Sequence, residues 1–186
     1  MLKKFSTKDL VFLALMGSAW FVLDFLIGQW INALTGIFLA GAFLGSIVAG
    51  FFVVIMIKIR PKFGTFTIAL LIFGLLAFPT GSSGPAGFWP KILINALTGF
   101  LGDLFILAMK YKNWAVFVAF YLLSAGLLYG LTGAMVLMGI PEAGKTLALL
   151  HFVVLGYWII GSIGLWLGFR VYNRIKDKNI VKQLSS

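Results

Sequence analysis

The chain of 186 residues has no cysteine and a single histidine, His151. Without cysteine it forms neither disulfides nor thiolate-bound metal sites, and one histidine cannot supply a histidine-rich metal centre. Negative charge is also scarce, because five acidic residues stand against 15 lysines and arginines. These absences predict that the protein holds no metal ion and performs no thiol chemistry.

The signatures of other enzyme classes are weak as well. We expect the chain to lack a phosphate-binding loop of the form Gly-x-x-x-x-Gly-Lys-Ser/Thr, and so not to energise itself with ATP. Asp24 and Asp103 are expected at different membrane depths, which argues against a two-carboxylate protease site. Ser82 and Ser83 have no general base nearby in the sequence. We therefore expect no enzyme, no catalytic residue and no cofactor bound by this chain.

What the chain has in abundance is apolar surface. It is 61% hydrophobic and 11% charged, and its mean hydropathy is +1.06, values far from those of a soluble domain. The net charge of +10 does not predict nucleic-acid binding, because the basic residues flank apolar spans instead of forming one basic face. We expect contact with anionic lipid instead. Residues 1–186 are interpreted as one multi-pass transmembrane domain in a prokaryotic cell membrane.

Apolar length and helix breakers predict an all-α bundle of six membrane spans. The predicted spans cover residues 10–30, 37–59, 64–78, 89–109, 114–139 and 147–172. The third is short, and a segment rich in proline, glycine and serine, residues 78–87, follows it. Free backbone groups there would be costly in lipid, so we expect an ordered outer loop that folds over the helices. Residues 31–36 and 140–146 are expected to form the other two outer connections.

The basic residues predict the topology. All but Lys91 and Lys145 lie before the first span or after the second, fourth and sixth spans. The positive-inside rule places such alternate gaps in the cytoplasm. Both termini are therefore expected to be cytoplasmic.

Small residues recur at intervals of four within the spans. The sets are Gly41, Gly45 and Ala49; Ala42, Ser46 and Gly50; Gly126, Gly130 and Ala134; and Gly164 with Gly168. Such spacing lets helix backbones approach closely. Packing within one bundle is the favoured interpretation of each set, with oligomerisation as the alternative. Ala14 and Ser18 form a similar small surface on the first span.

A few polar side chains fall inside the spans, where ionisable groups are functional candidates. Asp24, Asn95 and His151 are expected either to contact a ligand or to form buried hydrogen bonds between helices. Lys91 either serves an anionic group or extends to the outer surface. Asp103, near the inner end of the fourth span, is expected to form an interfacial ion pair with Lys110 or the adjacent basic loop.

In layout the chain resembles the substrate-specific S component of an energy-coupling factor (ECF) transporter. The resemblance rests on six spans, the short third span and the loop after it, with Lys62-Phe63-Gly64-Thr65 and Gly102-Asp103 as local matches. It implies a subunit that binds a vitamin or related micronutrient tightly from outside. It also implies docking on a transmembrane coupling subunit driven by two ATPases, which use the ATP. The family's Ala-x-x-x-Ala docking motif corresponds here to Ala14 and Ser18, with serine in the second position.

The resemblance also implies an outward-facing pocket over helices four to six. Helix direction independently places most of the following candidates in the outer half: Trp89, Lys91, Asn95, Tyr129, His151 and Trp158. Aromatic faces there suit a planar heterocycle that a few polar atoms orient. Asp24 joins the candidates for substrate binding if the first helix borders the pocket, and would then suit a cationic group.

Two other classes of function remain open at this stage. One is a self-contained small-solute transporter or channel-forming homo-oligomer, in which the glycine-rich faces join copies and Asp24 or His151 relays protons. The other is a noncatalytic subunit of a membrane assembly. ATP-independent transport by the chain alone would separate the first from an S component.

Overall fold

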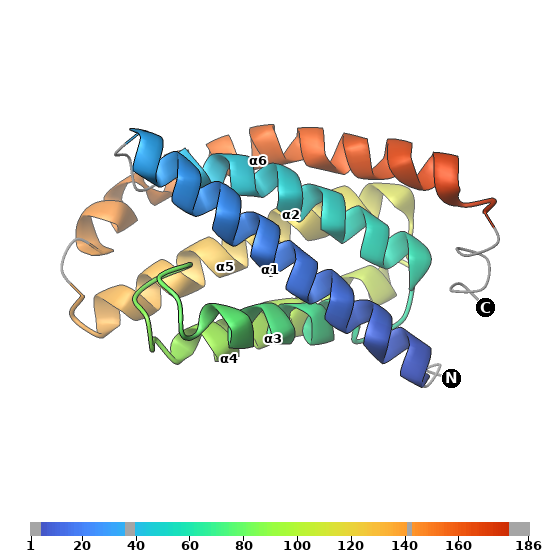
Figure 1. Cartoon of the computed structure of the whole chain (residues 1–186), viewed down its shortest axis with the longest axis horizontal. Helices are drawn as coiled ribbons and strands as arrows, with labels where there is room; N and C mark the ends of the chain where they lie inside the picture. Colours follow the sequence, from blue (N-terminus) through green and yellow to red (C-terminus); the bar gives the residue numbers. More distant parts are fainter. Residues whose placement is uncertain (1–4, 36–39, 141–142, 179–186) are drawn as a thin grey trace.

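The computed structural model describes residues 5–35, 40–140 and 143–178, which form six α-helices and no β-strand (Figure 1). The helices are α1 (Thr7–Thr35), α2 (Ala40–Ile59), α3 (Thr65–Ala77), α4 (Pro90–Ala108), α5 (Asn113–Leu137) and α6 (Ala143–Ile175). All except α3 are long and apolar enough to cross a membrane. The predicted all-α bundle of six helices, with a short third one, is confirmed.

Two helices run further than predicted. Helix α1 continues to Thr35 and α6 begins at Ala143, so much of residues 31–36 and 140–146 is helical and does not form an open connection. The prediction ended each span where the hydrocarbon core would end, but a helix continues until a breaker stops it. Nothing in residues 31–35 breaks a helix. The predicted start of the second span at residue 37 lies outside the described residues.

Glycine packing joins α2 to α6 along much of their length. A Cβ atom at Gly164 would overlap the backbone carbonyl of Ile47, and one at Gly168 would lie 2.8 Å from the Val54 Cβ. On the other side of the bundle, a Cβ at Gly126 would lie 3.1 Å from the Thr98 side chain of α4. These contacts match the interpretation of the small-residue sets as packing within one chain.

One end of the bundle collects the basic segments, and we call it the basic end. Asp9, near the start of α1, lies 2.7 Å from Arg60 Nε and 2.6 Å from Lys62 Nζ in the α2–α3 connection. Lys58 donates a hydrogen bond to Asn113 at the start of α5. Its Nζ also lies 5.5 Å from the ring centroid of Phe169 near the end of α6. The segments that carry most of the basic residues therefore lie at the same end of the bundle. That this end faces the cytoplasm stays a prediction.

Candidate functional site

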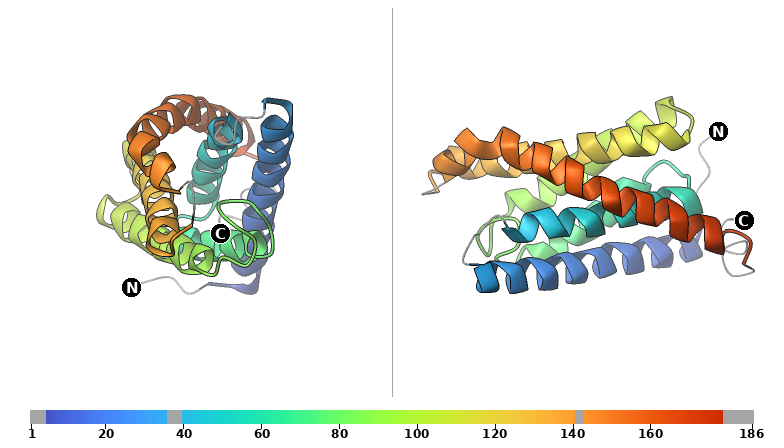
Figure 2. Two further views of the ribbon diagram at one scale, coloured as in Figure 1. Left: turned by 90° about the vertical axis from the view of Figure 1, so that its left-hand side faces the viewer. Right: turned by 90° about the horizontal axis from the view of Figure 1, so that it is seen from above.

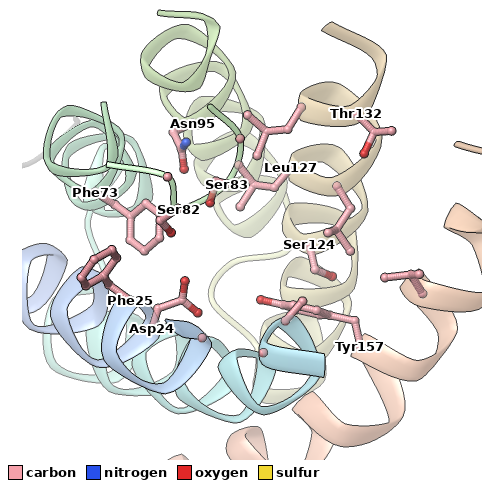
Figure 3. Close-up of a pocket in the computed structure, with 18 of the residues that line it drawn as sticks. Asp24, Phe25, Phe73, Ser82, Ser83, Asn95, Ser124, Leu127, Thr132 and Tyr157 are labelled. Atoms are coloured by element: carbon pink, nitrogen blue, oxygen red, sulfur yellow. The ribbon is translucent and has the colours of Figure 1, made fainter. Parts of the chain in front are cut away.

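A cavity of about 350 Å³ lies toward the end opposite the basic end, and residues of all six helices line it (Figure 3). Its aromatic walls come from Trp20 and Phe25 of α1 and Phe73 of α3. The Trp20 and Phe73 rings meet edge to face at 5.6 Å, which fixes this side of the wall. The polar side chains on the lining are Asp24, Gln29, Ser82, Ser83, Asn95, Ser124, Thr132, Thr146 and Tyr157. The site is thus mainly apolar with a few polar groups, as in small-molecule pockets.

The short helix α3 is held at its N-terminus by α4. The Asp103 carboxylate accepts hydrogen bonds from the backbone N–H of Phe66 at 3.0 Å and of Thr67 at 2.9 Å, and from the Thr67 hydroxyl at 2.7 Å. These amides belong to the first turn, where no partner exists within the helix. A carboxylate there also complements the positive end of the helix dipole. The predicted ion pair of Asp103 with Lys110 is wrong, because the α3 terminus satisfies the carboxylate and Lys110 is exposed.

The C-terminus of α3 is held by the other charge of α4. Lys91 is fully buried, and its Nζ donates to the carbonyl oxygens of Ala77 at 3.1 Å and Thr80 at 2.7 Å. A cation at this end complements the negative end of the helix dipole. Lys91 therefore does not extend to the surface, which was one of its two predicted roles. Lys91 is also not among the residues that line the cavity.

The distance between Lys91 and Asp103 along α4 matches the length of α3, which packs beside α4. Lys91 and Asp103 are twelve residues apart on α4, or about 18 Å, and the 13 residues of α3 span about 20 Å. Side chains of α4 therefore form hydrogen bonds with both ends of α3. The two helices also pack closely between these ends, since a Cβ at Gly99 of α4 would lie 2.7 Å from the Phe66 carbonyl oxygen of α3. This arrangement explains how a helix too short to span the membrane keeps its terminal groups satisfied.

The same lysine also holds the loop that covers the cavity. In the view onto the end opposite the basic end, the loop of residues 78–89 lies in front of part of the bundle (Figure 2, left), and residues 81–84 of the loop line the cavity. Lys91 binds the Thr80 carbonyl, and the Thr80 hydroxyl accepts from the Ser82 backbone N–H at 3.2 Å. Ser83 and Gly84 then adopt positive φ values of 59° and 122°, which turns the chain back over the lining. The prediction that this segment folds over the helices is confirmed.

Asp24 projects from α1 into the cavity. Among the described residues, none donates a hydrogen bond to its carboxylate or forms an ion pair with it. In Figure 3 the carboxylate points to the interior, and the Tyr157 hydroxyl of α6 points toward it. Gly45 of α2 leaves room for it, because a Cβ there would overlap Asp24 Oδ1. Asp24 therefore faces the cavity, and the buried helix-to-helix bond that was its alternative role is not formed with the described residues.

Asn95 approaches the cavity from α4 with one atom unused. Its Nδ2 donates to the Lys91 carbonyl at 2.7 Å, so the amide cannot be turned around without losing that bond. Its Oδ1 is then buried without a hydrogen-bond partner, and the side chain is 1% exposed. Figure 3 shows Asn95 on the side of the cavity opposite Asp24. A buried amide oxygen without a donor is costly unless a bound molecule supplies one.

Trp158 does not line the cavity, but it contacts a residue that does. Its indole Nε1 donates to Ser124 Oγ at 2.9 Å, and Ser124 lines the cavity. The Trp158 ring also packs on Tyr121 at 5.3 Å, and Tyr121 shares a hydrogen bond with Ser162. Trp158 thus joins α6 to α5 and orients a lining hydroxyl.

The other predicted site residues lie elsewhere. Trp89, Tyr129 and His151 are exposed and are not among the residues that line the cavity. Ala14 and Ser18 are partly exposed on α1, while Gly17 between them packs against the α3 backbone. The binding roles of the first three and the docking role of the last pair stay predictions.

Sequence reasoning overlooked Tyr157, Trp20 and Phe73. Tyr157 directly precedes Trp158 on α6. Successive residues of a helix point in different directions, so Tyr157 faces the cavity while Trp158 contacts α5. Trp20 lies four residues before Asp24, a spacing that places both on one face of a helix. That spacing was the signal that could have identified Trp20.

The expectation that the chain lacks a phosphate-binding spacing is wrong. Residues 139–146 have the sequence Gly-Ile-Pro-Glu-Ala-Gly-Lys-Thr, which fits Gly-x-x-x-x-Gly-Lys-Ser/Thr. A phosphate-binding loop of this type joins a β-strand to a helix. Here the segment leads from α5 to α6 in a bundle whose described residues include no strand. The spacing therefore occurs without the structural setting in which it binds nucleotides.

Comparison with known proteins gives one family. The family model described as a hypothetical bacterial integral membrane protein (Trep_Strep) matches residues 7–144. This range includes helices α1 to α5 and the loop over the cavity. No curated protein and no solved structure matches the chain.

Proposed function

The chain belongs to this family of bacterial integral membrane proteins, and we propose that it is the S component of an ECF-type importer. In this role it binds a vitamin or related micronutrient from outside the cell. It then docks on a transmembrane coupling subunit, and two partner ATPases supply the energy.

The observation that carries the proposal is the cavity with its ordered cover. It is enclosed by all six helices of one chain and covered by residues 81–84 of the loop. A volume of about 350 Å³ lies at the lower end of the range for small-molecule sites. A single chain that builds a covered site, and whose described residues contain no strand leading into a phosphate-binding loop, fits a binding subunit that relies on partners for energy.

The charge pattern gives the proposed direction. The positive-inside rule places the basic end, with Arg60 and Lys112, in the cytoplasm. The cavity and its loop then face outside, where a scarce nutrient would be captured. Cysteines introduced at Lys112 and Ser83 test this orientation with a membrane-impermeant thiol reagent on intact cells. We expect labelling at Ser83 and none at Lys112, and the opposite pattern would contradict the proposed direction of uptake.

The decisive experiment separates binding from transport. The full chain is purified alone, and native mass spectrometry identifies any small molecule that remains bound. The chain is then placed in proteoliposomes with and without the coupling subunit and ATPases, and uptake of that molecule is measured. We expect one bound molecule per chain, and uptake that requires both the partners and ATP. Steady uptake by the chain alone would instead establish a self-contained transporter.

The proposed docking face is tested with a matched pair of bulky substitutions. Ala14→Trp places a large side chain on the small surface of α1, whereas Leu122→Trp enlarges an exposed position on α5. We expect Ala14→Trp to abolish ATP-driven uptake while ligand binding by the isolated chain persists. Leu122→Trp should leave both intact. Equal loss of binding and uptake in Ala14→Trp would make this surface part of the internal packing.

The oligomeric channel has less support. The glycines that were candidates for joining copies pack inside the chain, as Gly164 does against Ile47 and Gly126 against Thr98. Their close-contact faces are therefore already used within the bundle.

A further inference from the structure

The cavity lining is rich in hydrogen-bond acceptors and lacks a positive charge. Among the described lining residues, Asp24 is the one that carries a formal charge, and none is lysine, arginine or histidine. Two lysines, Lys91 and Lys145, lie close in sequence to lining residues, but neither lines the cavity. Lys91 is committed to the carbonyls of Ala77 and Thr80, and Lys145 is exposed outside the lining. A negatively charged ligand group would find the Asp24 carboxylate and no cation to balance its charge.

Two of the acceptors are unsatisfied by the protein. The Asp24 carboxylate has no hydrogen-bond or ion-pair partner among the described residues. Asn95 Oδ1 is buried without a donor, and the bond from Nδ2 to Lys91 fixes its orientation. Asn95 is buried and Asp24 is half-buried, and removing an amide oxygen or a carboxylate from water, even in part, costs free energy unless a donor compensates. A bound molecule that supplies N–H groups would remove both costs.

The placement of these acceptors defines where the donors must be. In Figure 3, Asp24 and the Tyr157 hydroxyl approach from one side and Asn95 from the opposite side. The space between them is bordered by the aromatic rings of Phe25 and Phe73. Aromatic faces attract cations as well as planar rings. The walls and the acceptors therefore favour the same kind of molecule.

From this geometry we infer that the cavity binds a small planar cation that carries N–H donors. Its positive group lies on Asp24, and a second donor on the far side reaches Asn95 Oδ1. The inference rests on the proposed function, because it takes the cavity as the substrate site. It narrows the substrate to cationic, nitrogen-rich molecules of one or two rings, and it excludes phosphorylated and carboxylated ones.

The test uses three probes that share one ring system and differ in charge. They are 4-aminoquinoline, which is a cation at neutral pH, the neutral quinoline-4-carboxamide, and the quinoline-4-carboxylate anion. Isothermal titration calorimetry measures their binding to the purified full chain in detergent, after removal of any native molecule. We expect 4-aminoquinoline to bind at least tenfold more tightly than the amide, equivalent to about 1.4 kcal/mol. The anion should show no saturable binding.

Variants assign the preference to the carboxylate. Asp24→Asn keeps the shape of the side chain and removes its charge, and Asp177→Asn makes the same change at an exposed position beyond α6. We expect Asp24→Asn to reduce the preference for the cation over the amide to less than threefold. Asp177→Asn should leave it unchanged. The comparison of probes on the unmodified chain needs no variant, so the inference is testable even if Asp24→Asn folds poorly.

Several results would overturn the inference. They are equal binding of the three probes, tighter binding of the anion, no saturable binding of any probe, or a cation preference that survives Asp24→Asn. None of these results depends on the coupling subunit or on ATP. Uptake that requires the partners could therefore persist while the charge preference fails, which would refute the substrate class and leave the proposed function standing. Loss of ATP-dependent uptake with an intact cation preference would refute the importer instead.

Discussion

Asp103 and Asp24 are both carboxylates carried by apolar helices, yet the two regions around them differ. At the contact of α3 and α4, Asp103 accepts three hydrogen bonds and is 1% exposed. In the cavity, Asp24 accepts none from the described residues and faces open space. A carboxylate with all its donors in place stabilises the fold, whereas one without donors is a cost that a ligand can remove. The difference separates a structural charge from the charge that we propose binds a ligand.

The largest effect is expected when the structural carboxylate is removed. Asp103→Ala leaves the N–H groups of Phe66 and Thr67 and the Thr67 hydroxyl without an acceptor in a buried place. We expect the free energy of unfolding to fall by about 3 to 5 kcal/mol, because three neutral donors lose a charged acceptor and each buried donor left unsatisfied costs about 1 to 3 kcal/mol. Denaturant unfolding in detergent micelles, followed by circular dichroism, measures the change. Asp177→Ala, at an exposed position, should change stability by less than about 0.5 kcal/mol.

A small loss in Asp103→Ala would mean that the α3 terminus finds other partners. The comparison between the two carboxylates would then fail, because Asp103 would not be structural. Thr67→Val separates the contributions, since it removes the hydroxyl bond and leaves both backbone bonds. We expect it to cost about 1 kcal/mol.

The second prediction concerns the other end of α3. Lys91→Met keeps much of the side-chain volume but leaves the Ala77 and Thr80 carbonyls without their donor. We expect a loss of about 2 kcal/mol, because hydrogen bonds from a charged group are stronger than neutral ones. The cover of the cavity should also loosen. A cysteine at Ser83 should then react faster with a thiol reagent in Lys91→Met than in Lys145→Met, where an exposed lysine is changed.

The architecture was largely accessible from the sequence, because span length and basic gaps depend on the bilayer and not on side-chain contacts. The contact of α4 with α3 was not recognised. Lys91 and Asp103 were each interpreted alone, as a possible anion site and an interfacial ion pair. Their separation on α4, compared with the length of the short third span, contained the signal.

The cavity was harder to predict for a geometric reason. Depth in the membrane follows from position along a span, and it placed Trp89, Tyr129 and His151 in the outer half. Whether a side chain faces the bundle interior depends on rotation about the helix axis, which apolar helices without a polar face do not reveal. Asp24 and Asn95 were found because polar groups in a membrane mostly face protein or water.

The third prediction tests the ion pairs of the basic end. Arg60 is 3% exposed and lies 2.7 Å from Asp9. Arg60→Met removes one cation, but Lys62 remains on the same carboxylate at 2.6 Å. We therefore expect the free energy of unfolding to fall by only about 1 to 2 kcal/mol, less than for a buried charge that is left without any partner. Arg174→Met at an exposed position of α6 is the control. A loss as large as that of Asp103→Ala would show that Lys62 does not compensate.

The smallest effect, and one of opposite sign, is expected at Asp24. In the ligand-free protein, Asp24→Asn replaces a half-buried carboxylate, which has no partner among the described residues, with a neutral group of the same shape. Stability should stay the same or rise by about 1 kcal/mol, as at other sites where function opposes stability. Thermal unfolding of the stripped protein measures this, with Asp177→Asn as the control. Adding 4-aminoquinoline should then raise the unfolding temperature of the unmodified chain and not that of Asp24→Asn. If Asp24→Asn unfolds as readily as Asp103→Ala, Asp24 supports the fold and the contrast between the two carboxylates is wrong.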